Sequence, residues 1–546
     1  MYAVNDQLVV SEETDRIIVS LQDENQIRQL AKVPNYGMQI VGNKIMIALP
    51  WEDTTCRILN NIGINAFMAS PFWREDHPKI EGKYEGMQHQ LLTAAFIALN
   101  PRCYVLSDCR LGKTGSLILG MDYLQKHCAF SGGVLVITTV TTLRNVWETS
   151  IKQTLPKVSV AVLHGKGKTL IEKPYNWYVT NYDTIRLNTK AFERAILHGR
   201  IGAIVIDELT HVGNSSSQRH KAIAHLANNC GLEYIVGMPG SPGSNPEPVY
   251  GMARAVNPTK LPVRTKTGWM NLTTFAYGSE PYMRAPVADC GKYIRAALTP
   301  AIRFKKEDVL DLPPITYQDR DCALTVAQRK VIEQFRADAI AYIEDNPAVT
   351  AANAAVVLNK LLQVPLGFVM SSDADSHPID IEHSIRTDVI LDAVHETSRK
   401  VVIFSMFKHR LRMLQQELTD AGISSEMIDG SITGDKRAAI LSAFQQEDAG
   451  PKVLCAHPIT VGFGTELSVA DTVIFDGPPV LGTFVYTQSL ERLSSPKQKA
   501  SNINVIKIMA TKEEREMFRR LDSGQRAGAI IAEMFEEFKN YVLKEC

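Results

Sequence analysis

A short segment between an apolar run and a helix-forming run holds the residue types that bind phosphate. The segment is LSDCRLGKTGSLILG, residues 106–120. In it Gly112 lets the backbone approach a phosphate, Lys113 can reach the β and γ phosphates, and Thr114 offers a hydroxyl ligand for Mg²⁺. The full phosphate-loop pattern has a glycine where Ser107 stands. By itself such a loop can occur by accident, so the hypothesis needs an acidic partner.

A pair of carboxylates supplies that partner. In AIVIDELTH, residues 203–211, an apolar strand ends at Asp207 and Glu208. One carboxylate is needed to hold Mg²⁺ and a second group to activate the attacking water. An acidic pair can also cap a surface helix. Because further strands separate this pair from the phosphate loop, we favour the metal and water roles and predict a site for ATP and Mg²⁺.

The elements that carry these residues alternate between strand and helix. From residue 104 to residue 238 short β-rich runs are separated by helical stretches, and a second such series begins at residue 400. This alternation is typical of an α/β fold with parallel sheets and helices on both faces. We expect four segments, listed in chain order: an accessory domain at 1–80, a first lobe at 81–250, helical insertions with a linker at 251–385, and a second lobe at 386–546.

The composition limits the class of protein without identifying a partner. Apolar residues make up 45% and charged residues 22%, as in globular domains. Lys plus Arg equals Asp plus Glu at 59 each, so any contact with a nucleic-acid backbone needs a local basic surface. The acidic N-terminus and the lack of a run of about 18 apolar residues predict a cytoplasmic protein without a membrane segment.

The cysteines and histidines do not follow a known metal-site spacing. Nine cysteines occur without CxxC pairs and without histidines at zinc-finger spacing, which argues against a structural metal site of that kind. Free thiols in a reducing compartment are the expected state. Trp147 and Trp177 are expected to fill core edges rather than to stack on bases. Lys305 and Lys306 could form a DNA contact or a solvated charge cluster.

Further segments follow one another in a specific order. KYEGMQHQLLTAAFIALN precedes the phosphate loop, and VLVITTVTTLRNVWETSIKQTLP and GMPGSPGSNPEPVYG stand on either side of the acidic pair. A glycine-rich turn and YTQSLERLSSPKQ lie near the end. In this order the sequence resembles superfamily 2 helicase-type ATPases, above all the Swi/Snf-type DNA translocases, from residue 84 to the C-terminal helix. The resemblance implies two tandem RecA-like lobes.

The resemblance also implies roles for individual residues. Gln90 would contact adenine, and Gly464 and Gln488 would contribute to nucleotide binding from the second lobe. Arg492 would stabilise the transition state across the lobes, while Lys113, Asp207 and Glu208 would act from the first. Thr114 and Asp207 would hold Mg²⁺. Ser241 would take the hydroxyl position of the coupling motif, and the segment containing Trp147 would line the DNA path.

Three residues depart from the pattern of this family. Arg110 replaces the glycine usual two residues before Gly112 and belongs to the predicted nucleotide-binding set. Glu466 stands where the family generally has asparagine. Ser495 stands where a second arginine is expected, so Arg492 would act alone or with another residue.

By resemblance, the expected function is an ATP-dependent motor that moves on duplex or branched DNA in replication, repair or recombination. We expect a monomer that meets replication or repair proteins, and the short chain suggests a phage or bacterial source. One alternative is a strand-separating DNA or RNA helicase. Another is a DNA-binding adaptor that hydrolyses ATP poorly, which Arg110 and Ser495 would favour.

Overall fold

The structure is a computed structural model that divides into two compact units, Met1–Val309 and Leu310–Cys546. It describes residues 2–21, 26–27, 30, 37–41, 44–80, 82, 85–108, 110–239, 246–276, 284–310, 312–345, 358–371, 377–432, 434–461, 466–479, 483–495 and 498–523. The segment 251–385, predicted as one insertion and linker, is divided between the two units. Among the helices of the described residues, none is long and apolar enough to cross a membrane.

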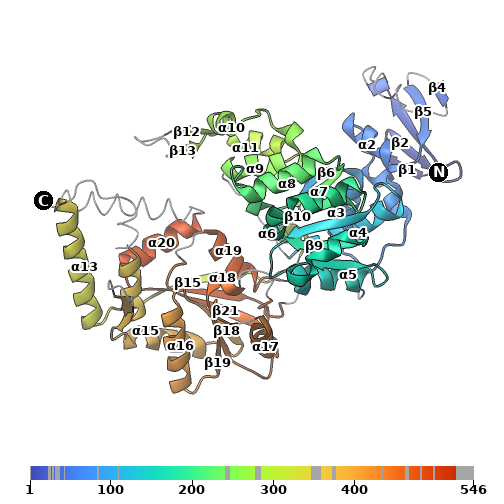
Figure 1. Cartoon of the computed structure of the whole chain (residues 1–546). Helices are drawn as coiled ribbons and strands as arrows, with labels where there is room; N and C mark the ends of the chain where they lie inside the picture. Colours follow the sequence, from blue (N-terminus) through green and yellow to red (C-terminus); the bar gives the residue numbers. More distant parts are fainter. Residues whose placement is uncertain are drawn as a thin grey trace. The chain divides into compact units, whose positions relative to one another are not determined.

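The N-terminal part of unit 1 is a five-stranded antiparallel sheet with the order β1-β2-β3-β5-β4 (Figure 1). Its elements are β1 (Tyr2–Asn5), β2 (Leu8–Ser11), β3 (Arg16–Leu21), β4 (Gly37–Val41), β5 (Lys44–Pro50) and α2 (Asp53–Asn61). Inward and outward side chains alternate along β3, as expected for a sheet with one buried face. Leu99 of the neighbouring helix joins this small core, and the Tyr123 hydroxyl donates to Asp53 over 2.6 Å. These contacts tie the N-terminal sheet to the rest of unit 1.

A seven-stranded parallel sheet with the order β14-β6-β11-β10-β7-β9-β8 forms the centre of unit 1. Its strands are β6 (Arg102–Val105), β7 (Gly133–Thr138), β8 (Val160–Leu163), β9 (Trp177–Asn181), β10 (Ile201–Asp207), β11 (Tyr234–Met238) and β14 (Ala301–Ile302). Every residue of β7, β9 and β11 is buried, which is the pattern of parallel strands covered on both faces. The predicted parallel α/β arrangement is confirmed.

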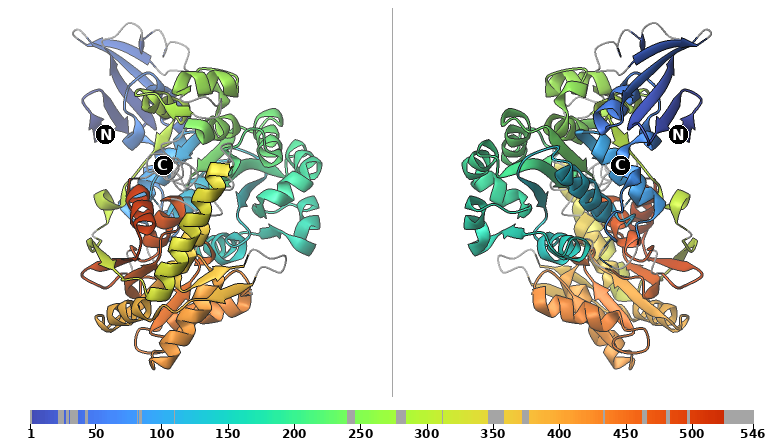
Figure 2. Two further views of the ribbon diagram at one scale, coloured as in Figure 1. Left: turned by 90° about the vertical axis from the view of Figure 1, so that its left-hand side faces the viewer. Right: turned by 90° about the vertical axis from the view of Figure 1, so that its right-hand side faces the viewer.

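Helices cover both faces of this sheet (Figure 2). One core lies under α3 (Gln88–Leu99), α4 (Lys113–Lys126), the π-helix η3 (Leu143–Glu148) and α5 (Thr149–Thr154). The other lies under α6 (Tyr182–Leu187), α7 (Thr189–Leu197), η5 (Leu209–Val212), α8 (Gln218–Asn229) and α9 (Pro246–Val256). Trp147 and Trp177 are fully buried in the first of these cores, deeper than the core edges at which we expect them from the sequence.

The remaining elements of unit 1 are short. They are η1 (Phe67–Ala69), η2 (Pro71–Arg74), η4 (Gly165–Glu172), η6 (Pro258–Lys260), α10 (Lys266–Thr273), β12 (Thr274–Ala276), β13 (Arg284–Pro286), α11 (Cys290–Ala297) and α12 (Lys306–Val309). Trp269 of α10 and Ala297 of α11 are buried in the same core as α8 and α9. The helices between β11 and Val309 therefore lie in unit 1.

Unit 2 is built on a six-stranded parallel sheet with the order β15-β22-β21-β18-β20-β19. Its strands are β15 (Ile315–Asp321), β18 (Lys400–Phe404), β19 (Ser425–Ile428), β20 (Val453–Ala456), β21 (Ala470–Asp476) and β22 (Ile503–Met509). A small hairpin of β16 (Phe368–Met370) and β17 (Pro378–Asp380) stands apart from this sheet. The second predicted series of strands thus forms the second parallel sheet.

Two cores again lie on opposite faces of the sheet. One involves α15 (Ser384–His395) and α16 (Lys408–Asp420), and the other α17 (Gly434–Phe444), α18 (Pro458–Val461), α19 (Thr483–Glu491) and α20 (Lys512–Asp522). The long α13 (Val326–Asp345) and η7 (Val364–Leu366) contribute to a smaller third core. Alternate residues of β18 enter the two main cores, with Val401 and Ile403 on one face and Val402 and Phe404 on the other.

A buried ion network holds the end of β21 to the helices beside it. Asp476 accepts from Arg386 Nε and from Arg410 Nε, each over 2.7 Å, and all three side chains are essentially unexposed. Arg386 also donates to Glu514, and Arg410 donates to Glu417. Burial disfavours the carboxylate, but Arg410 and Arg386 together lower the pKa of Asp476 below its ordinary value. The network therefore favours an ionised Asp476 at neutral pH.

We expect Asp476→Asn to destabilise unit 2 by about 3–5 kcal/mol, because it leaves two buried guanidinium groups without their shared anion. All five tryptophans precede residue 270, so tryptophan fluorescence follows unit 1 while far-ultraviolet circular dichroism follows both units. The expected result is a new, earlier transition in urea seen by circular dichroism and an unchanged fluorescence transition.

Asp321→Asn is the matched control, because Asp321 pairs with Arg515 over the same 2.7 Å but both side chains are more than half exposed. Its cost should stay within about 1 kcal/mol. Because the pKa of Asp476 is lowered in the folded state, its contribution is present above the ordinary aspartate pKa of about 3.9 and is lost as pH falls further. Equal stability of the two variants at pH 7 would contradict the network's role.

Candidate nucleotide-binding site

The predicted phosphate loop connects β6 to α4. Gly112 is the N-cap of α4 and has φ 73°, in the left-handed region that favours glycine. A β-carbon at this position would lie 1.9 Å from Gln90 Nε2. Both the backbone conformation and the neighbouring amide therefore require glycine. Lys113 and Thr114 follow in the first helical turn, where unpaired backbone N–H groups favour anions.

Lys113 is held at the loop by a backbone carbonyl of the same loop. Its Nζ donates to the carbonyl of Ser107 over 2.8 Å, and the side chain is half-buried. A neutral carbonyl is a weaker partner for an ammonium group than a phosphate. The amine of Lys113 therefore lies at the loop, and a phosphate could replace the Ser107 carbonyl as its hydrogen-bond acceptor.

Gln90 and His89 of α3 anchor the backbone just before Gly112. Gln90 Nε2 donates to the carbonyl of Leu111 over 3.3 Å, and its Oε1 accepts from the backbone N–H of Met87 over 2.9 Å. His89 Nε2–H donates to the same Leu111 carbonyl over 3.0 Å. Burial lowers the pKa of His89 more than this hydrogen bond raises it, so the ring is neutral at pH 7. The contact of Gln90 with adenine stays a prediction.

Ser107 and Arg110 both stand in the phosphate loop where a glycine is usual. The hydroxyl of Ser107, at the missing glycine, accepts from the backbone N–H of Phe304 over 3.1 Å. The loop and the segment after β14 continue as a ladder in which Leu106 N–H donates to Ile302 and Asp108 N–H to Phe304. Arg110 has φ 67°, which explains why glycine is the usual residue there.

The segment after β14 therefore runs alongside the residues that lead from β6 into the phosphate loop. Lys306 N–H donates to Asp108 Oδ2 over 3.0 Å, and the Phe304 ring lies edge-on to His89 with centroids 5.8 Å apart. Lys305 is exposed and pairs with Glu307 over 2.8 Å. The ion pair shows that Lys305 belongs to a surface charge cluster, and its contact with DNA stays a prediction.

The acidic pair lies at the carboxyl end of β10, separated from the phosphate-loop strand β6 by β11. Thr138 Oγ1 at the end of β7 and Trp147 Nε1 of η3 each donate to Asp207 Oδ2 over 2.8 Å. The N–H of Glu208 donates to Asp207 Oδ1 over 3.1 Å. Since a carboxylate accepts about four hydrogen bonds or ligands, Asp207 keeps capacity for one more. Its oxygens and the Thr114 hydroxyl are the hard donors that Mg²⁺ prefers, so the residues present fit this ion.

Glu208 adopts an unusual backbone conformation that a second contact supports. Its φ of 52° and ψ of 51° are left-handed, a conformation that costs a non-glycine residue about 1 kcal/mol or more. The buried Tyr182 hydroxyl donates to the carbonyls of both Asp207 and Glu208. Burial, strengthened by Asp207 and Glu208, raises the pKa of Tyr182 well above its ordinary value, so the hydroxyl keeps its proton. Tyr182 thus holds the strained turn that presents the acidic pair.

Sequence reasoning did not identify Thr138, Trp147, Tyr182 or His89 as site residues. Each is separated from its partner by many residues in the chain and reaches it only through the strand order. A signal existed for Thr138 and Tyr182, because both lie where a buried strand ends, at the edge of the sheet where sites of parallel α/β folds form.

We expect Trp147→Phe to lower ATP turnover about tenfold and to raise the Mg²⁺ concentration needed for half-maximal activity, because Asp207 loses one of its orienting donors. Trp177→Phe is the matched control. Trp177 is also fully buried, but its indole N–H has no hydrogen-bond partner within the described part of the chain. The measurement is ATPase activity as a function of Mg²⁺ for both variants. Identical Mg²⁺ curves would show that Trp147 only fills space.

In unit 2, Gln488 and Arg492 lie together in the motif that follows β21. Arg492 Nη2 donates to Gln488 Oε1 over 2.8 Å, and Gln488 Nε2 donates to Glu491 over 3.1 Å. Both Gln488 and Arg492 are more than nine-tenths buried. Residues three apart, such as Arg492 and Ser495, would share one face of a continuous helix, but α19 ends at Glu491, before both of them. Predicted Gly464 and Ser241 lie outside the described residues.

Glu466 and Ser495, the two departures from the family pattern in unit 2, contact each other. Ser495 Oγ donates to Glu466 Oε1 over 3.2 Å, and the N–H of Ser468 donates to the same oxygen over 3.3 Å. Glu466 replaces an asparagine and Ser495 an arginine in the family pattern, so the two replacements form one hydrogen-bonded pair. An arginine at 495 would meet a carboxylate there rather than an amide.

Two family descriptions match the chain. Residues 98–365 match the SNF2-related domain, and residues 385–497 match the helicase conserved C-terminal domain. Together these ranges include Lys113, Asp207 and Arg492 and span most of the chain. The chain belongs to the SNF2-related, or Swi/Snf-type, family of helicase-type ATPases, whose fold is two tandem RecA-like domains.

Individual relatives are distant in sequence. The chain is 24% identical over 390 residues to the zebrafish (Danio rerio) chromodomain-helicase-DNA-binding protein 1-like, a match that covers 68% of this chain and 36% of the relative. It is 24% identical over 423 residues to an uncharacterized ATP-dependent helicase of Mycoplasma pneumoniae, covering 74% of this chain and 38% of the relative. The chain therefore spans less than half the length of these relatives.

Among solved structures, the chain is similar to the Sulfolobus solfataricus SWI2/SNF2 ATPase core in complex with dsDNA. The sequence identity is 18% and the TM-score 0.39, and the match covers 86% of this chain and 96% of that one.

Proposed function

We propose that the chain is an ATP-dependent DNA translocase that hydrolyses ATP and moves on duplex or branched DNA without needing to separate its strands. The observation that carries the proposal is the edge of the unit 1 sheet, where Gly112–Lys113–Thr114 and Asp207–Glu208 follow two strands of one parallel sheet. Membership of the Swi/Snf-type family supports DNA as the track. The role in replication, repair or recombination is part of the same proposal.

The residues of unit 1 divide the work of hydrolysis. Lys113 binds the phosphates and offsets their charge, and the N-terminus of α4 adds backbone donors. Thr114 and Asp207 would hold Mg²⁺, which neutralises phosphate charge when bound. Glu208 would orient the attacking water and accept its proton. Thr138, Trp147 and Tyr182 keep the acidic pair in one orientation.

In the proposal, Arg492 of unit 2 stabilises the charge that develops on the γ-phosphate during hydrolysis. Its hydrogen bond to Gln488 orients the guanidinium, so less side-chain entropy is lost when it acts. Because Ser495 stands where the family has a second arginine, Arg492 is the one arginine of this motif that acts on the γ-phosphate.

The test is ATPase activity without nucleic acid and with single-stranded DNA, duplex DNA, forked DNA and RNA. A translocase on duplex DNA is expected to be stimulated most by duplex or forked DNA. Displacement of a third strand from a triplex then reports movement along an intact duplex. No stimulation by any nucleic acid would contradict the proposal.

A strand-separating helicase is the second candidate, because the nucleotide motifs are shared. Release of a labelled strand from a tailed duplex, with no triplex displacement, would favour it. The departures at Arg110 and Ser495 favour a third candidate, an adaptor with poor hydrolysis. DNA binding without DNA-stimulated phosphate release would identify that adaptor.

A further inference from the structure

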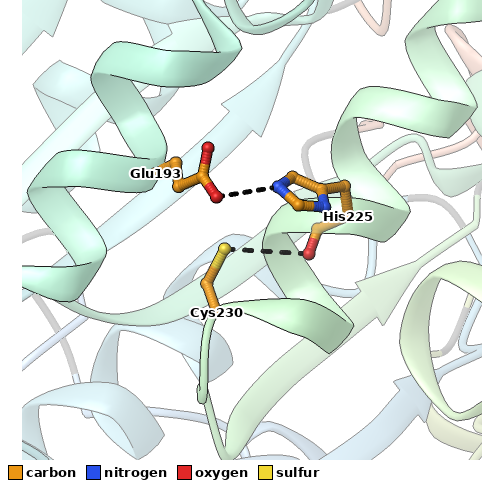
Figure 3. Close-up of side chains that lie close together, drawn as sticks. All are labelled: Glu193, His225 and Cys230. Carbon is orange, nitrogen blue, oxygen red and sulfur yellow. Dashed lines mark hydrogen bonds and ion pairs between the residues drawn. The ribbon is translucent and has the colours of Figure 1, made fainter.

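Three side chains of metal-ligand type meet where α7 packs beside the end of α8 (Figure 3). They are Glu193 of α7, His225 of α8 and Cys230, the C-cap residue of α8. One ligand atom from each lies within 4.8 Å of the other two. The nucleotide-binding residues do not belong to this cluster, because α7 and α8 cover the opposite face of the sheet from α4.

A hydrogen bond joins the side chains of His225 and Glu193, and the Cys230 thiol is bonded to the backbone of His225. His225 Nε2 lies 3.1 Å from Glu193 Oε1, and the Cys230 thiol donates to the carbonyl of His225 over 3.8 Å. The Asn229 side-chain amide lies 3.3 Å from the second ring nitrogen, His225 Nδ1. Cys230 is 7% exposed, whereas the side chains of His225 and Glu193 are about one-third exposed. The cluster thus has a buried sulfur and a route from solvent.

We propose that Glu193, His225 and Cys230 form a binding site for a divalent transition metal, with Zn²⁺ as the ion that fits best. Thiolate and imidazole ligands select Zn²⁺ over Mg²⁺ and Ca²⁺, which prefer oxygen donors. Zinc bond lengths of about 2.0–2.3 Å in a tetrahedron separate ligand atoms by about 3.3–3.6 Å. The Glu193–His225 distance is already close to this range, and the sulfur lies within 4.8 Å of a ligand atom of each of the other two residues.

Asn229 supplies the outer contact that such a site needs. With His225 Nε2 on the metal, Nδ1 carries the proton and must donate it. The Asn229 amide, turned so that its oxygen faces the ring, accepts that hydrogen bond. A water molecule completes the fourth position. The bound ion joins α7 to the end of α8 and so stabilises unit 1.

Sequence spacing could not reveal this cluster. His225 and Cys230 are five residues apart at one helix end, and Glu193 comes from a different helix, 32 residues before His225. None of the usual zinc-finger spacings joins them.

The test uses the full chain, freed of metal with a chelator and titrated with Zn²⁺ in excess Mg²⁺ against a chromophoric competitor. The wild type is expected to bind one equivalent of Zn²⁺ more than Cys230→Ser or His225→Asn, and each substitution is expected to weaken that site at least about tenfold. Co²⁺ in place of Zn²⁺ should give a thiolate charge-transfer band that Cys230→Ser removes. The thermal unfolding midpoint of the wild type should rise with Zn²⁺ by a few degrees.

Cys128→Ser is the matched control, because Cys128 is an exposed free thiol in the same unit. It should bind Zn²⁺ as the wild type does. The proposal is overturned if Cys230→Ser and His225→Asn bind Zn²⁺ like the wild type, or if Cys128→Ser loses the site. Because the readouts are metal binding, absorbance and stability, the result does not depend on the ATPase proposal.

Discussion

Lys113→Ala is expected to reduce ATP turnover by about 10³ while the protein stays folded. The substitution removes the cation that offsets phosphate charge, and the loss of one such preorganised contact costs about 10²–10³ or more in other enzymes. In the structure the amine donates to the Ser107 carbonyl from a half-buried position, so its removal empties no core. That hydrogen bond contributes only about 1 kcal/mol to stability. The measurement is steady-state ATPase activity at saturating duplex DNA.

Lys126→Ala is the control for this prediction. Lys126 lies at the other end of the same helix α4, where its exposed side chain pairs with Asp122 over 2.7 Å. This variant should keep ATP turnover close to that of the wild type. The tryptophan fluorescence transition, which reports unit 1, should be nearly the same for both variants. Near-normal hydrolysis by Lys113→Ala would refute the phosphate-loop assignment.

Arg492→Ala is expected to cost at least about a hundredfold in turnover, toward the range of about 10³–10⁵ seen for such arginines. ATP affinity should change little, because the side chain acts mainly in the transition state. Arg519→Ala is a control, since Arg519 is an exposed arginine of unit 2 that pairs with Glu516. Turnover and ATP binding are measured with saturating duplex DNA. If Arg492→Ala hydrolyses ATP like the wild type, the transition-state arginine lies elsewhere.

The contact between Ser495 and Glu466 determines the expected effect on ATP hydrolysis of placing the family's second arginine at position 495. Ser495→Arg alone is expected not to accelerate hydrolysis, because the new guanidinium meets the Glu466 carboxylate in a buried position. The double variant Glu466→Asn with Ser495→Arg restores both family residues and is expected to exceed the single variant. Circular dichroism checks that each variant is folded. A single variant as active as the double would show that Glu466 does not restrain the arginine.

The sequence by itself determined the class of fold and the main chemical groups. Buried strands such as GVLVIT of β7 are too uniformly apolar for a half-exposed sheet, which indicates parallel strands with helices on both faces. Gly112 before Lys113 and Thr114 marks a strand-to-helix turn because glycine tolerates the left-handed conformation found there. Asp207 and Glu208 were identified because they end an apolar strand. These signals are local, and local sequence is sufficient to produce them.

Tertiary structure decided which residues, far apart in the chain, contact the phosphate loop, the acidic pair and one another. Trp147 reaches Asp207 across 60 residues of chain, and Ser107 reaches Phe304 across 197. Glu466 and Ser495, which look like two independent departures, form one pair. Glu193 joins His225 and Cys230 from a separate helix. Periodicity predicts elements but not which strands and helices become neighbours, and hydrogen bonds form only between groups that the strand order and helix packing bring within about 3 Å.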